Sequence, residues 1–258
     1  MQPGYLVRRG LARAALGGIA LYVVIDVALV FLRPEFSVLH NAESDYGSAG
    51  GWAWLMDVNF VLRCLASLAA VGGLALAVPT GDTSSDITGG RATGRNAKHA
   101  GGRDTDERVA GRRGGRLRVA LALLVVWALA SGLLALFPDD PAGTPLRATG
   151  RVHLALASTA FLAALIGTIL ATAVLSRQPE WQGRRVSLLA LSWGSIVPLT
   201  LVSRTGFRAD SLGGLYEKVF LAAQLAWLVV ASVPVARGRA APHSRPAAGE
   251  EPTARLSD

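Results

Sequence analysis

Residues 33–57 read RPEFSVLHNAESDYGSAGGWAWLMD. This stretch contains carboxylates, amides, hydroxyls and one histidine, yet it lies between two long apolar runs. A polar segment between runs long enough to cross a bilayer is typical of a loop that joins two transmembrane helices. We therefore expect residues 33–53 to form a non-cytoplasmic loop that caps a bundle of membrane helices.

The composition of the whole chain agrees with a membrane protein. Of its 258 residues, 51% are hydrophobic and only 17% are charged. The apolar residues occur in blocks of about 20, the length that a helix needs to cross a bilayer. The sequence therefore predicts an all-α, polytopic membrane protein whose membrane domain, residues 14–235, is a six-transmembrane-helix bundle. The expected spans are about 14–32, 54–78, 119–137, 152–175, 186–202 and 216–235.

Three segments outside these spans are polar. Residues 1–13 form a short basic N-terminus, and residues 236–258 form a polar tail that we expect to be disordered. Residues 80–118 are rich in Gly, Arg and Asp and contain few large apolar side chains. Such a segment cannot bury enough surface to offset the entropy of ordering, so we expect a disordered loop there. Pro198 lies inside the fifth span and predicts a kink.

The distribution of positive charge predicts the orientation. Of the 26 Lys and Arg residues, 19 lie in the N-terminus, residues 80–118, residues 176–186 and the tail, and 6 lie in the opposite loops. Cytoplasmic segments of membrane proteins carry the excess of Lys and Arg. We therefore expect a multi-pass protein of the cell membrane with both termini in the cytoplasm (N-in/C-in). Membrane lipids are expected partners of such a protein. Nucleic acid is not an expected partner, because the orientation in the membrane accounts for the positive charge.

One histidine and two aspartates are candidate catalytic residues. Asp139 and Asp140 follow the third span, and His153 lies in the first turn of the fourth. The two spans are antiparallel and joined by a short loop, so these side chains should be neighbours. A histidine beside a carboxylate can be a general base, a proton relay, half of a metal site or a structural hydrogen bond. No tight spacing of metal ligands is present, so we predict no metal and no cofactor.

Further polar residues gather on the same predicted face and are candidates for binding a ligand. Arg33 could hold an anionic headgroup or could instead order the loop through an ion pair with a carboxylate. Ser44 could be a nucleophile beside His40, or Ser44 and Asp45 could cap a short helix or turn. The binding candidates are Arg33, Glu35, His40, Ser44, Asp45, Asp57 and Glu217.

Two charged residues fall inside predicted spans. Asp26 lies about 10 Å and Arg63 about 13 Å below the predicted interface, at 1.5 Å per helical residue. An unpaired charge at this depth is costly, so we expect an intramembrane ion pair between Asp26 and Arg63. The pair could be structural, or one partner could bind a substrate or a proton.

Five short motifs together resemble a known family. They are LRPE at 32–35, SDYG at 44–47, FPDDP at 137–141, GRVH at 150–153 and GLYE at 214–217. In this order, and all on one predicted membrane face, they resemble the bacterial and archaeal membrane family catalogued as domain of unknown function 998. The resemblance implies an integral membrane protein with six helices. It implies no activity.

The sequence thus leaves three functions open. The first is a sensor or accessory protein that binds a small molecule or lipid in a polar pocket on the non-cytoplasmic face. The second is a proton-coupled transporter that uses Asp26 and Arg63. The third is a membrane-embedded enzyme that uses His153 with Asp139 or Asp140, and the sequence does not decide whether the protein is an enzyme.

Overall fold

The computed structural model describes residues 3–48, 50–78, 100–140, 144–145, 147–207 and 210–238. The predictions for residues 80–99 and for the tail from 239 onward lie outside these residues. Over the described ranges, all regular secondary structure is helical. Six of the described segments are long and apolar enough to cross a membrane: Gly4–Leu32, Ala53–Ala77, Gly114–Leu136, Ala148–Leu175, Pro179–Thr205 and Gly213–Ala236. The protein is therefore an all-α membrane protein with six transmembrane helices.

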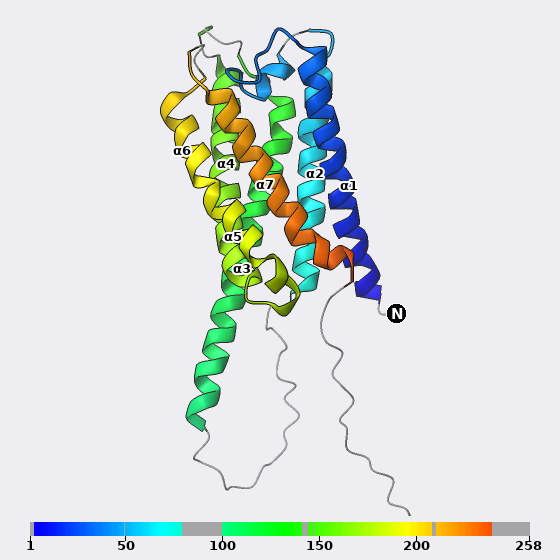
Figure 1. Ribbon diagram of the computed structural model, residues 1–258, viewed down its shortest axis with the longest axis vertical. Helices are drawn as coiled ribbons and strands as arrows, with labels where there is room; N and C mark the ends of the chain where they lie inside the picture. Colours follow the sequence, from blue (N-terminus) through cyan, green and yellow to red (C-terminus); the bar gives the residue numbers. More distant parts are fainter. Residues whose placement is uncertain are drawn as a thin grey trace, which may run out of the picture.

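The first four spans form two antiparallel pairs. Helices α1 (Pro3–Leu32) and α2 (Ala53–Ala77) pack against each other, as do α3 (Ala100–Leu133) and α4 (Ala148–Leu175). Contacts between α2 and α3 join the two pairs. Helix α7 (Gly213–Ala236) crosses the bundle obliquely and contacts helices of both pairs (Figure 1). It is the most buried of the six spans, so its side chains connect the two halves of the protein.

The fifth span is broken in the middle. A 3₁₀ helix, η3 (Pro179–Arg184), leads into α5 (Arg185–Gly194), and α6 (Ile196–Thr205) follows after Ser195. The predicted kink at Pro198 is present three residues before the proline. Proline has no N–H to donate to the carbonyl of Gly194, four residues earlier, and its ring clashes with that carbonyl. The helix therefore breaks at Gly194–Ser195 and resumes with a hydrogen bond from Leu199 N to Ser195 O of 3.3 Å.

Small residues allow the helices to approach closely. A Cβ atom at Gly18 of α1 would lie 2.8 Å from Cβ of Ala66 on α2, so only glycine fits there. On α4, a row of small residues is buried at Ala160, Ala164 and Ala171. Rows of this kind pack one membrane helix against another.

Helix α3 begins earlier than the sequence predicts. Residues 100–118 belong to the segment expected to be disordered, but the helix starts at Ala100. Once the apolar span has formed a helix, each added residue gains one backbone hydrogen bond without a new nucleation cost. Arg, which recurs in this segment, is a good helix former.

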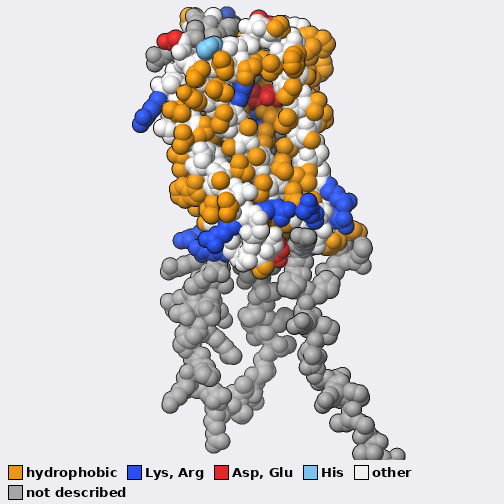
Figure 2. Space-filling view, in the orientation of Figure 1, with side chains coloured by type: hydrophobic (Ala, Val, Ile, Leu, Met, Phe, Trp, Pro, Cys, Tyr) orange, Lys and Arg blue, Asp and Glu red, His pale blue; other side chains and the backbone are white. Residues whose placement is uncertain are grey.

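The two ends of the bundle differ in charge. Figure 2 shows a belt of hydrophobic side chains over the middle of the molecule and Lys and Arg side chains gathered at the end that carries the N-terminus. We call this the basic end. The other end carries the turns between α1 and α2, α3 and α4, and α6 and α7, and we call it the loop end (Figure 1). The described arginines near the basic end include Arg8, Arg9, Arg116, Arg118, Arg177, Arg184, Arg185 and Arg237.

Candidate functional site

The loop between α1 and α2, residues 33–52, folds into the loop end of the bundle, and we call it the cap loop. Its 3₁₀ turn, η1 (Ser44–Gly47), is preceded by Ala42 and Glu43, and Ala42, Glu43, Asp45 and Tyr46 are all buried. A polar loop that is buried must satisfy its own hydrogen-bonding groups.

Arg33 organises the cap loop from within. Its Nη1 donates hydrogen bonds to Tyr46 O at 2.9 Å and Ser48 O at 3.0 Å, and its Nε forms an ion pair with Glu35 at 2.6 Å. The guanidinium also lies over the Phe36 ring, 4.8 Å from its centroid. The hydrogen bond from Arg33 lowers the pKa of Glu35 below its usual value. Arg33 is itself buried, so the structure places both predicted binding residues in the architecture of the loop.

The cap loop rests on the start of α7. His40 Nδ1–H donates to Ser211 O at 2.6 Å, and Leu215 N donates to Leu39 O at 3.0 Å. At Gly214 a Cβ atom would collide with the backbone of Asn41, so glycine is required for this approach. These contacts place Glu43 directly beside α7.

Glu43 is a buried carboxylate that contacts α1 and α2. Its Oε2 lies 2.7 Å from Nη1 of Arg63, and its Oε1 accepts a hydrogen bond from the Tyr22 hydroxyl. Arg63 Nη1 also donates to the Tyr22 hydroxyl at 3.3 Å. Glu43 and Arg63 are both almost fully buried.

This ion pair replaces the predicted one. Among the described residues, Arg63 pairs with Glu43, and Asp26 is not an ion-pair partner of it. The position of Asp26 along α1 led to the prediction that it pairs with Arg63. Instead, the cap loop enters the bundle and places the Glu43 carboxylate beside Arg63. The buried charge of Arg63 needs a partner of opposite charge. Glu43 is that partner, in place of the predicted Asp26.

His153 and Asp139 meet at the top of α3 and α4, as predicted. His153 Nδ1–H donates to Phe137 O at 2.7 Å, which directs Nε2 toward Asp139 Oδ2 at 3.7 Å. The same oxygen accepts a hydrogen bond of 2.9 Å from the Ser44 hydroxyl of the cap loop. Asp140 instead accepts the backbone N–H of Arg147 at 2.6 Å. Asp139 therefore links three elements, while Asp140 orders the turn before α4.

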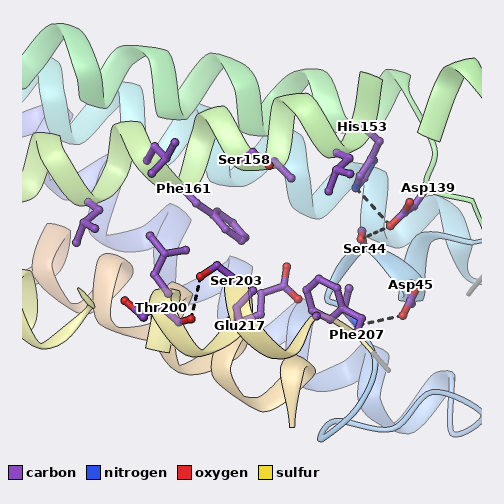
Figure 3. A pocket seen from close by; sticks show the side chains of 18 of the residues that line it. Ser44, Asp45, Asp139, His153, Ser158, Phe161, Thr200, Ser203, Phe207 and Glu217 are labelled. Carbon is purple, nitrogen blue, oxygen red and sulfur yellow. Dashed lines mark hydrogen bonds and ion pairs between the residues drawn. The ribbon is translucent and has the colours of Figure 1, made fainter. Parts of the chain in front are cut away.

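A cavity of about 720 Å³ lies between α4, α6 and α7 at the loop end. Its polar end is formed by the cap loop, the turn after α3 and the first turns of α4 and α7 (Figure 3). Its apolar wall is formed by α4 and α6. The polar lining residues named by the sequence analysis are Ser44, Asp45, Asp139, Asp140, His153 and Glu217. The apolar lining residues include Leu154, Phe161, Leu162, Leu165, Ile196, Leu199 and Phe207.

The cavity opens toward the side of the bundle. Helix α5 packs against α4 and α7, whereas α6 packs mainly against α7, so the break at Ser195 separates α6 from α4. Leu154 and Leu162 of α4 and Ile196 of α6 line the cavity and are nevertheless 53%, 55% and 37% exposed. All three lie within spans, so the opening between α4 and α6 is at the level of the hydrophobic belt.

Asp45 is held at the polar end by its own loop. Its Oδ2 accepts hydrogen bonds of 2.9 Å from both the Asn41 side chain and the Ala42 backbone N–H. Burial raises the pKa of the Asp45 carboxyl above its usual value, although these hydrogen bonds act in the opposite direction. The carboxylate is thus fixed in position beside the cavity.

The structure brings together only some of the predicted site residues. Five of the predicted residues do not line the cavity: Arg33, Glu35, His40, Asp57 and Asp26. The sequence did not predict that Phe161 and Phe207 line the site. It also did not predict the opening between α4 and α6. The short fifth span with its internal proline was the one signal of that opening. Among the described residues, no three His, Cys, Asp or Glu side chains converge as metal ligands.

Comparison with known proteins identifies a family and no individual relative. No curated protein and no solved structure matches the chain. The family described as "Protein of unknown function (DUF998)" matches residues 16–92 and 107–234, which cover most of the chain and all or most of each of the six spans. The resemblance seen in the five loop-end motifs is thereby confirmed, and the chain belongs to the DUF998 family of proteins of unknown function.

Proposed function

We propose that this protein binds one amphipathic molecule in the cavity between α4, α6 and α7 and acts as a membrane sensor or accessory protein. The observation that carries the proposal is the division of the cavity wall. Carboxylates, a histidine and a serine line the end near the cap loop. The rest is lined mainly by aliphatic and aromatic side chains, together with Ser158, Thr200 and Ser203. A molecule with a polar head and an apolar tail matches this division.

The size and position of the cavity support the same proposal. Its volume of about 720 Å³ falls in the range of small-molecule sites, about 300–1,000 Å³. The opening between α4 and α6 lies among exposed apolar side chains, so a ligand dissolved in the bilayer would enter without crossing water. A small molecule that never enters the bilayer would have no need of a lateral opening.

The distribution of Lys and Arg supports one orientation in the membrane. With the basic end in the cytoplasm, the cavity opens into the outer leaflet of the cell membrane. Single cysteines introduced into a Cys64→Ser background test this orientation. A cysteine at Ser48 should react with a membrane-impermeant maleimide on intact cells, and one at Gly183 should react only after the membrane is opened. The reverse result would place the cavity in the inner leaflet.

Crosslinking tests whether the cavity is occupied. A photoreactive alkyl diazirine with a polar head, added to membranes, should label peptides of α4 and α6 that line the cavity. Ser158 lines the cavity from α4, and Ser158→Trp should block the labelling by filling the space. Thr159→Trp, one residue along the same helix and outside the cavity lining, is the matched control. Labelling that is equal in both variants would contradict the proposal.

One observation favours a second function, an enzyme that acts on the bound molecule. His153 Nε2 faces Asp139 at 3.7 Å in the wall of the cavity, while the hydrogen bond to Phe137 O holds the ring. A histidine oriented in this way beside a carboxylate can transfer a proton. Conversion of the crosslinking probe or of a co-purified lipid by the wild type, and not by His153→Gln, would establish this function.

The transporter alternative has less support. Its proposed charges, Asp26 and Arg63, are not paired with each other, and Arg63 is engaged by Glu43. That ion pair ties the cap loop to α2, which is a structural role.

A further inference from the structure

We infer that the ligand of this cavity is a cationic amphiphile, whose ammonium group pairs with Glu217. The inference rests on the proposed function, because it names the chemical class of the molecule that the cavity binds. Glu217 lies one turn into α7 and is only 6% exposed, and it lines the cavity at its polar end.

The Glu217 carboxylate has no cationic partner of its own among the described residues. Its Oε2 accepts the backbone N–H of Glu43 at 2.7 Å, and the ion pairs of the described residues do not include it. Figure 3 shows the carboxylate pointing into the cavity. A buried carboxylate is stabilised by a positive charge, and a ligand can supply that charge.

Two described basic residues near Glu217, Lys218 and Arg63, are engaged elsewhere. Lys218, the next residue in α7, donates to Asn41 O at 2.9 Å and lies over the Tyr46 ring. Arg63 is paired with Glu43. Neither Lys218 nor Arg63 lines the cavity. The Glu217 carboxylate therefore lines the cavity and forms no ion pair with either of these cations.

The other lining residues make the polar end still more negative. Asp45, Asp139 and Asp140 line it together with Glu217, and the described residues of the lining include neither lysine nor arginine. Among those described residues, His153 is the single basic side chain, and it is held between Phe137 O and Asp139. The carboxylates of this end repel other negative charges. An anionic headgroup that carries no ammonium group, such as a phosphate or sulfate, is therefore disfavoured there.

Aromatic rings add to the preference for a cation. Phe161 and Phe207 both line the cavity, as Glu217 does. The face of an aromatic ring attracts an ammonium group, and quaternary ammonium ions are recognised in this way in other proteins. The apolar wall of α4 and α6 would hold the alkyl tail.

A matched set of short amphiphiles tests the inference. The full-length protein, purified in a non-ionic maltoside detergent, is titrated with octyltrimethylammonium, octyl sulfate and octanol below their micelle concentrations. Binding is measured by calorimetry. We expect the cation to bind at least about tenfold more tightly than the sulfate, a difference of about 1.4 kcal/mol. Added salt should reduce this preference, because it screens the charges.

Variants then assign the preference to one carboxylate. Glu217→Gln keeps a carbonyl oxygen to accept the Glu43 N–H but removes the charge, and it should reduce the preference for the cation to less than about threefold, which is about 0.7 kcal/mol. Glu35→Gln removes a carboxylate at the same end of the protein but outside the cavity, and the preference should not change. If Glu217→Gln does not fold, the comparison of cation with sulfate in the wild type still decides whether the site prefers a cation.

The outcomes separate this inference from the proposed function. Binding of all three probes with equal affinity, blocked by Ser158→Trp, would overturn the cationic ligand and leave the amphiphile site in place. No binding of any probe would overturn both. Competition by phosphatidylethanolamine but not by phosphatidylglycerol would support an ammonium supplied by a bilayer lipid. Binding of octyltrimethylammonium without such competition would support a free amphiphilic amine.

Discussion

Glu43 of the cap loop forms a 2.7 Å ion pair with Arg63 in α2, and both side chains are almost completely buried. The pair joins a loop that connects two spans to the interior of one of them. It therefore fixes the cap loop in the position that forms the polar end of the cavity.

Breaking this ion pair should destabilise the protein strongly. Arg63→Leu leaves Glu43 as an orphaned buried charge, which costs about 3–5 kcal/mol. The double variant Glu43→Gln, Arg63→Leu should be more stable than Arg63→Leu alone, because no uncompensated charge remains. Thermal unfolding in detergent measures both. Asp26→Asn is the control. If Asp26→Asn lowers the melting temperature as much as Glu43→Gln does, and if the effects of the Glu43 and Arg63 substitutions on stability are additive, Arg63 pairs with Asp26 as predicted from the sequence.

The protein should also lose stability as the pH rises through the range in which Asp45 ionises. Its pKa is raised in the folded protein, so the folded state binds this proton more tightly than the unfolded chain does. The stabilisation is complete below the unfolded value, about 3.9, and is lost as the pH rises through the higher folded value. Asp45→Asn should flatten this part of the curve of melting temperature against pH.

Glu35 should act in the opposite sense and serves as the comparison. Its pKa is lowered by Arg33, so its contribution is present above the unfolded value and lost as the pH falls. Glu35→Gln should leave the Asp45-dependent decline in place. A decline that persists unchanged in Asp45→Asn would show that another group causes it.

Substitutions of His153 should distinguish its hydrogen bond from its ring chemistry. His153→Ala removes the donor to Phe137 O and leaves a void at a buried site, so it should cost about 1–3 kcal/mol of stability. His153→Gln retains a side-chain N–H donor and should recover part of this loss. The melting temperatures of the two variants test the prediction, and a glutamine variant no more stable than the alanine variant would contradict it.

Pro198 should control the opening of the cavity. Pro198→Ala restores an N–H that can donate to Gly194 O, which favours a continuous helix in place of α5 and α6. A straighter fifth span would bring α6 toward α4, so binding of an alkyl probe should weaken while the protein remains folded. Pro234→Ala near the end of α7, remote from the cavity lining, is the matched control. Undiminished probe binding in Pro198→Ala would show that the break does not form the opening.

The sequence was sufficient for the fold because each span is an apolar block bounded by polar residues. The sequence also predicted that Asp139 lies beside His153. A short turn between antiparallel helices leaves the two helix ends little freedom to separate. The pairing of Arg63 could not be obtained in the same way. Helical depth locates residues within spans, but it does not show that the cap loop would carry Glu43 into the bundle.

The cavity was only partly predictable for a related reason. Its polar residues lie in loop-end motifs that stand out from apolar surroundings. Its apolar wall depends on the separation of α6 from α4, and the leucines of those helices look like any lipid-facing leucine in the sequence. The break at Ser195 was signalled by Pro198, but the direction in which α6 leaves depends on packing against α7.

Native mass spectrometry of the gently extracted protein tests the central claim most directly. The wild type and Thr159→Trp should each retain one bound amphiphile, and Ser158→Trp should lose it. The bound species should carry an ammonium group. A wild-type spectrum without bound amphiphile, or an equal amount bound to Ser158→Trp, would contradict the assignment of the cavity as a ligand site.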